Sequence, residues 1–131
     1  MNILVGYIPT PEGLAAIDYA TAQAKSTGAK LTVLNTGKDG DYAHPVFATA
    51  EDVDALDAQL SGAGIDHDIR RPTDGLGAAD ALLSVAEEIS ADLVVIGIRR
   101  RSAVGKLITG STAQAVLLGA ACPVVAVKAK S

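Results

Sequence analysis

The sequence predicts an α/β protein: a doubly wound, five-stranded parallel sheet in the order 3-2-1-4-5, with helices on both faces. Segments of strand and helix character alternate strictly along the chain, β-α-β-α-β-α-β-α-β, which predicts parallel strands joined by right-handed crossovers. Residues 2–7 and 92–98 are continuous apolar runs, as is typical of central strands covered on both faces. If these two runs are neighbours, the winding of the sheet reverses between the first and fourth strands.

The first strand, residues 2–7 (NILVGY), is followed by a helix over residues 10–28. Thr10 suits the N-cap of that helix, Pro11 its first turn and Gly28 its end. Small and apolar residues recur along it and predict its buried stripe: Leu14, Ala15, Ile17, Ala20, Ala22 and Ala24. Residues 30–35 (KLTVLN) are the second strand.

The middle of the chain predicts a loop, a helix and an edge strand. Residues 36–49 hold Gly, Asp and Pro and read as a loop, and residues 50–64 place Val53, Leu56 and Leu60 on one helical face. Residues 65–71 (IDHDIRR) alternate between apolar and polar, which is an edge-strand pattern.

The last part predicts the remaining four elements. After a turn at residues 72–77, a helix over 78–90 directs Leu82, Val85, Ala86 and Ile89 inward. The fourth strand, residues 92–98, leads through a long loop to a helix over 111–120 that Ser111 would cap. The chain closes with a strand over 122–128, whose proline lies at its start, where no ladder hydrogen bond is lost.

Composition limits the classes of partner. A length of 131 residues predicts one domain, residues 1–131, with a core of ordinary size. Aromatic residues make up only 3% of the chain, so stacking platforms for bases are scarce. A net charge of −4 also disfavours a polyanion, and we therefore expect no nucleic-acid partner.

Targeting features point to the cytoplasm. No apolar run reaches the roughly eighteen residues that cross a bilayer, so we expect no membrane association. The N-terminus lacks a basic region and a cleavage site, which disfavours secretion. Cys122 is the single cysteine and has no Cys or His at metal-ligand spacing, so we expect neither an internal disulfide nor a metal site there.

Residues 97–111 (GIRRRSAVGKLITGS) follow the fourth strand, where the predicted topology places a ligand. Ligands of such sheets bind outside the carboxyl ends of the strands at the reversal, here residues 7–10 and 97–101. A phosphate loop of the G-x-x-x-x-G-K-[ST] type is rejected, because Arg100 replaces its first glycine and Leu107 its hydroxyl. No G-x-G-x-x-G follows the first strand, so a dinucleotide fingerprint is also absent.

The loop instead combines two glycine positions with a dense group of cations. Gly97 closes a strand, and Gly110 and Ser111 open a helix whose first amides point outward unpaired. Forked and single donors for an anion are supplied by Arg99, Arg100, Arg101 and Lys106. The alternative interpretation is a structural turn with a helix cap and solvated arginines.

These residues resemble the universal stress protein family across the whole chain. The resemblance rests on NILVGY at the start, ADLVVIG before the loop, GSTAQAVL after it and CPVVAVK at the end. Nucleotide-binding members carry a glycine, two residues, a glycine, nine residues, then a glycine with serine or threonine. Gly97 and Gly110-Ser111 match that spacing, and Arg100 occupies the middle glycine position.

The resemblance implies that ATP or a related adenine nucleotide lies across the switch point, with Mg²⁺ as a candidate companion ion. The matching phosphate-side positions are Gly97, Gly110 and Ser111, with Thr112 just behind them. Ile96 and Thr36 occupy positions that would border the adenine. The remaining candidate residues are Ile8, Pro9 and Thr10 at the end of the first strand.

The first strand departs from the family pattern. Binding members usually end it with an aspartate near a Gly-Ser pair, whereas this chain has Ile8 and then Pro9-Thr10. Loss of this carboxylate removes a hydrogen bond to the ribose or the base. A hydrogen bond to a charged group typically contributes about 1.5–3 kcal/mol. The alternative function is therefore a homodimeric scaffold or interaction module that does not bind nucleotide.

We expect a regulatory, nucleotide-binding stress-response module rather than a dedicated enzyme. The sequence offers no nucleophile–base pair, His44 and His67 included, so any ATP hydrolysis would be slow. In the family the last strand commonly pairs with its counterpart in a second subunit, which implies a homodimer through residues 122–128. A flavodoxin-like redox domain fits less well, because the first loop lacks a hydroxyl-rich phosphate pattern.

Overall fold

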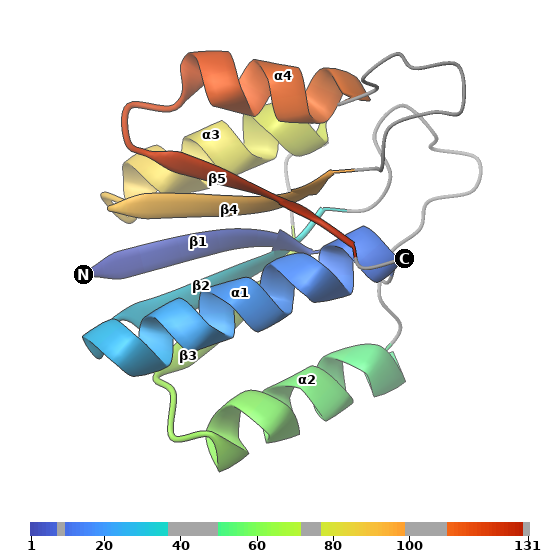
Figure 1. Cartoon of the computed structure of the whole chain (residues 1–131), viewed down its shortest axis with the longest axis vertical. Helices are drawn as coiled ribbons and strands as arrows, with labels where there is room; N and C mark the ends of the chain where they lie inside the picture. The colour runs from blue at the N-terminus through green and yellow to red at the C-terminus, as the bar shows by residue number, and fades with distance from the viewer. Residues whose placement is uncertain (8–9, 37–49, 72–76, 99–109, 130–131) are drawn as a thin grey trace.

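Five parallel strands form one sheet in the order β3-β2-β1-β4-β5, which confirms the predicted fold class and topology (Figure 1). The computed structural model describes residues 1–7, 10–36, 50–71, 77–98 and 110–129. The strands are β1 (Asn2–Tyr7), β2 (Lys30–Asn35), β3 (His67–Arg70), β4 (Leu93–Ile98) and β5 (Val124–Lys128). The helices are α1 (Pro11–Thr27), α2 (Ala50–Gly62), α3 (Ala78–Glu88) and α4 (Gly110–Gly119).

The two most apolar runs lie side by side in the sheet, as predicted. β1 pairs with β4 through Ile3–Leu93, Leu4–Val94 and Val5–Val95, and with β2 along its whole length. The connection from β1 leads outward to β2 on one side, while β4 leads to β5 on the other. The switch point therefore lies between the carboxyl ends of β1 and β4.

The helices cover the sheet in two pairs, α1 and α2 on one face and α3 and α4 on the other (Figure 1). Because side chains alternate along a strand, each face has its own core. Val5 and Val95 pack with Ile17 of α1 and Leu60 of α2. On the opposite face, strand residues pack with Leu82 of α3 and Val116 of α4.

Helix α1 begins and ends where the sequence predicts, but its buried stripe differs. The Thr10 hydroxyl accepts a hydrogen bond from the Gly13 amide at 3.1 Å, and Gly28 closes the helix with φ 72°. The buried residues are Gly13, Ala16, Ile17, Ala20 and Ala24. Leu14 and Ala22 were expected inside and are exposed instead, because the helical period starts from Gly13, which packs closely against the sheet.

Every element after β2 differs at an end from its predicted bounds: α2 ends at Gly62 instead of residue 64, α3 ends at Glu88 instead of residue 90, and β4 begins at Leu93 instead of residue 92. β3 is shorter than residues 65–71, and β5 starts at Val124, where the carbonyl of Pro123 accepts the Val94 amide at 3.0 Å. α4 begins at Gly110, so Ser111 lies inside its first turn and is not the N-cap. Among the described residues, no helix is both long and apolar enough to cross a bilayer.

Candidate functional site

The candidate site lies at the carboxyl edge of the sheet, where the N-terminal ends of α1 and α4 approach from opposite faces (Figure 1). Both helices are the next elements in the chain after strands of the central pair, α1 after β1 and α4 after β4. A helix N-terminus carries unpaired amides and a partial positive charge, which favour an anion. At α1, Pro11 has no amide hydrogen, the Gly13 amide is capped by Thr10, and Glu12 is acidic, so the α4 end is the one that favours an anion at this switch point.

On the α4 side, the backbone of Gly110, Ser111 and Thr112 forms the first turn of the helix. In an α-helix the amides of the first turn have no intrahelical acceptor and remain able to donate to a ligand. α4 contains no acidic residue in that turn, so no carboxylate of its own competes for these donors. These three predicted residues are therefore brought to the same edge as the ends of β1 and β4.

Gly97 has a packing role that the sequence did not reveal. A Cβ on Gly97 would overlap the backbone carbonyl of Glu12 and lie 3.1 Å from the Gly13 amide nitrogen. The glycine thus lets the first turn of α1 rest on the end of β4. The contact with α1 alone therefore requires glycine at position 97, whether or not a ligand also approaches it.

Three further predicted residues lie at this edge, and each makes a contact that stabilises the fold: Thr10, Thr36 and Ile96. The Thr10 hydroxyl caps α1, and the Thr36 amide donates to the carbonyl of Tyr7 at 3.1 Å, which extends the β1–β2 ladder. Ile96 is buried in the core beneath α3 and α4. A ligand would therefore meet the backbone of Ile96 rather than its side chain.

The predicted residues Ile8, Pro9, Arg99, Arg100, Arg101 and Lys106 lie outside the described residues, as does His44. Their placement relative to the edge stays a prediction from sequence.

Two polar residues lie at the ends of β1 and β2: sequence reasoning did not name Asn35, and it included Tyr7 only in the range 7–10. Tyr7 and Asn35 are partners in the β1–β2 register, and both are buried. Burial, and then the negative charge of Asp52 in the first turn of α2, raise the pKa of the Tyr7 hydroxyl, so it is neutral at physiological pH. An amide residue at the carboxyl end of a parallel strand is the signal that would have drawn attention to Asn35.

His67 lies away from this edge, on β3, and has a specific partner. Its Nδ1 is 2.8 Å from the carbonyl of Ile65, and its Nε2 is 2.6 Å from Asp57 Oδ1 of α2. The backbone carbonyl and then the Asp57 carboxylate raise the pKa of His67. The histidine is a link between β3 and α2, and among the described residues no group of three or more His, Cys, Asp or Glu side chains could hold a metal ion.

Comparison with known proteins shows which family the chain resembles. The model of a family described as the universal stress protein family matches residues 1–128. A universal stress protein of Mycolicibacterium smegmatis is 40% identical over 126 residues, which cover 96% of each chain.

Solved structures agree with the fold. The universal stress protein from Archaeoglobus fulgidus is 29% identical and superposes with a TM-score of 0.69, covering 98% of each chain. A structure of the universal stress protein from Archaeoglobus fulgidus in complex with dAMP is 24% identical, with a TM-score of 0.63 and the same 98% coverage of each chain. At that identity the second similarity shows the fold alone.

Proposed function

This chain belongs to the universal stress protein family, and we propose that it binds an adenine nucleotide between the carboxyl ends of β1 and β4. The observation that carries the proposal is the start of α4 at that edge, with a first turn that contains no acidic residue. The dAMP complex of a protein with the same fold supports an adenine nucleotide as the ligand class.

In the proposed complex, the phosphates lie against the first turn of α4. The amides of Gly110, Ser111 and Thr112 donate to phosphate oxygens, and the helix dipole adds to the attraction. The cations that precede this turn in the chain, Arg99 to Arg101 and Lys106, supply further charge. The base and ribose then lie at the carboxyl ends of β1 and β2, near Thr10 and Thr36.

The proposed role is binding and regulation rather than turnover. Any Mg²⁺ would be held mainly by the nucleotide phosphates, because the described residues provide no metal-ligating cluster. ATP hydrolysis would be slow, since nothing in the sequence pairs a general base with an attacking water. We place the protein in the cytoplasm, in keeping with a single cysteine that cannot form an internal disulfide.

We also propose a homodimer through residues 122–128. β5 is an edge strand, its residues Val124–Val127 are only half-buried, and such an edge favours pairing with another chain. The neighbouring helix α4 contains no charged residue and exposes Leu117 at 45% and Leu118 at 80%. Exposed leucines on the helix next to this edge strand support a self-complementary interface.

A scaffold that does not bind nucleotide is the second candidate. Ile8 stands where binding members of the family carry an aspartate. The contact between Gly97 and α1 also gives that glycine a purpose without a ligand. In this second candidate function the protein is still a homodimer, but it does not bind nucleotide.

The nucleotide bound by the protein as isolated tests the two candidates. Purified protein is denatured, and the released small molecules are identified by mass as AMP, ADP, ATP or cyclic AMP. Stoichiometric adenine nucleotide supports the binding function. A nucleotide-free protein that also fails to bind these compounds when they are added supports the scaffold.

A further inference from the structure

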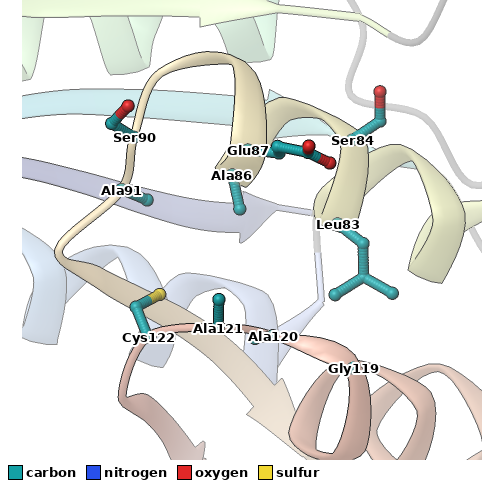
Figure 2. Close-up of a pocket in the computed structure, with 10 residues that line it drawn as sticks. All are labelled: Leu83, Ser84, Ala86, Glu87, Ser90, Ala91, Gly119, Ala120, Ala121 and Cys122. Carbon is teal, nitrogen blue, oxygen red and sulfur yellow. The ribbon is translucent and has the colours of Figure 1, made fainter.

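A hollow lies at the opposite, amino edge of the sheet, between the C-terminal ends of α3 and α4 (Figure 2). Its volume is about 470 Å³, within the range of small-molecule sites. One wall comes from α3 and the turn that follows it, and the other from residues 119–122, which lead into β5. It is therefore separate from the candidate nucleotide site, which lies at the carboxyl edge.

The side chains that line this hollow are mostly small or apolar. Figure 2 shows Leu83 and Ala86 pointing from α3 toward residues 119–122, with Cys122 on the facing wall. A Cβ on Gly119 would lie 2.9 Å from Leu83 Cδ1, so the two helices already touch at that end. Burial raises the pKa of the Cys122 thiol, which stays protonated at neutral pH and presents an apolar surface.

The charged side chains at and near the hollow are acidic. Among the ten described residues that line it, Glu87 carries the only charge, and its side chain is exposed at the rim. Asp92 lies close enough to Cys122 for its charge to act on the thiol. α3 and α4 both direct their C-terminal ends here, and neither has a basic residue in its last turn to offset the negative end of its dipole.

We propose that this hollow binds a short aliphatic amine, with the ammonium group at Glu87 and the helix C-terminal ends and the methylene chain over Ala86, Ala121 and Cys122. Charge complementarity selects the cation, because a carboxylate and two helix C-termini favour positive charge. The small lining residues provide the width for an unbranched chain. The ammonium stays hydrated on its open side, since Glu87 lies at the rim.

The test uses three probes of the same length and different charge: n-butylammonium, 1-butanol and butyrate. Each is titrated into the ¹⁵N-labelled full chain, and backbone amide shifts are followed by NMR. For a probe this small we expect saturation in the range of about 1–50 mM. Butylammonium should shift the amides of residues 84–91 and 119–122, while butanol and butyrate should shift them far less.

Two variants and a matched control locate the site. Glu87→Gln should weaken butylammonium about two- to fivefold, as expected for an exposed ion pair, and Ala121→Leu should abolish binding by filling the hollow. Asp18→Asn removes an exposed carboxylate from α1, on the other face of the sheet, and should leave the affinity unchanged. The amide spectrum of each variant shows directly whether it is folded.

Equal shifts with all three probes, shifts that map outside residues 84–91 and 119–122, or no saturable shift would each overturn the proposal. So would an affinity that Glu87→Gln leaves unchanged.

Discussion

The hydrogen of Gly97, at the end of β4, faces the backbone carbonyl of Glu12 in the first turn of α1, and no side chain fits between them. This contact holds the N-terminal end of α1 over the central strand pair. It also explains why Gly13 is buried while the larger Leu14 is exposed. The position of α1 at the candidate site thus depends on a glycine in a strand.

Gly97→Ala should destabilise the protein, because the added methyl overlaps backbone atoms that cannot rotate away. Overpacking of this kind typically costs about 1–3 kcal/mol of unfolding free energy, and urea denaturation measures it. Gly62→Ala is the matched control: Gly62 ends α2 with nothing within 4 Å of its Cβ position. That variant should be neutral or more stable by up to about 1 kcal/mol. Equal stability of the two variants would contradict the packing role of Gly97.

Thr10→Ala should cost about 1 kcal/mol of stability, because the Gly13 amide loses the hydroxyl that caps α1. Thr10→Ser keeps the acceptor and should behave like the original protein in the same urea titration. If serine destabilises as much as alanine, the hydroxyl is not what stabilises the helix start.

The sequence predicted the fold well, since it depends on patterns that the whole chain repeats. Apolar runs at residues 2–7 and 92–98 located the centre of the sheet, and alternation of elements fixed its parallel sense. The buried stripe of α1 was predicted less well, because hydrophobicity pointed to Leu14 whereas backbone approach at Gly13 decided the rotation of the helix.

The candidate site was predictable in position and less so in detail. The switch point follows from strand order alone, and α4 begins at Gly110. A role of Gly110, Ser111 and Thr112 in binding a ligand there stays a prediction. The pairing of Tyr7 with Asn35 depends on the register of β1 and β2, which no local pattern encodes. The contact of His67 with Asp57 depends on how α2 packs against β3.

His67 should make stability depend on pH. Both of its ring nitrogens face oxygen acceptors, the Ile65 carbonyl and Asp57, so the doubly protonated ring satisfies both. Because the folded pKa is raised above the ordinary value of about 6.5, this contribution is fully present below that value. It is lost as pH rises through the folded pKa.

The measurement is an NMR titration of the His67 ring, together with urea denaturation at pH 6 and pH 9. The original protein should lose stability over this interval relative to His67→Gln, by an amount on the order of an exposed ion pair, about 0.2–1 kcal/mol. Asp57→Asn should lower the pKa of His67 without removing the larger backbone contribution. A His67 pKa at or below the ordinary value would exclude this link.

Leu118→Asp should disrupt the proposed homodimer without unfolding the protein, because Leu118 is 80% exposed on α4. A carboxylate placed in an apolar interface is left desolvated when the subunits associate. Light scattering at micromolar concentration should show a dimer for the original protein and a monomer for the variant. An exposed residue on another helix provides the control, and Gln59→Asp on α2 should remain dimeric. If the original protein is itself a monomer, the proposed homodimer is contradicted.

Calorimetric titration of the nucleotide-free protein with ATP and AMP tests the central claim most directly. We expect saturable heat of binding, lost in Gly110→Val, whose branched side chain obstructs the first turn of α4, and retained in His67→Ala, which lies away from the carboxyl edge. Circular dichroism of each variant verifies that the fold is kept. Absence of heat with either nucleotide, or equal heat in Gly110→Val, would contradict a nucleotide site between β1 and β4.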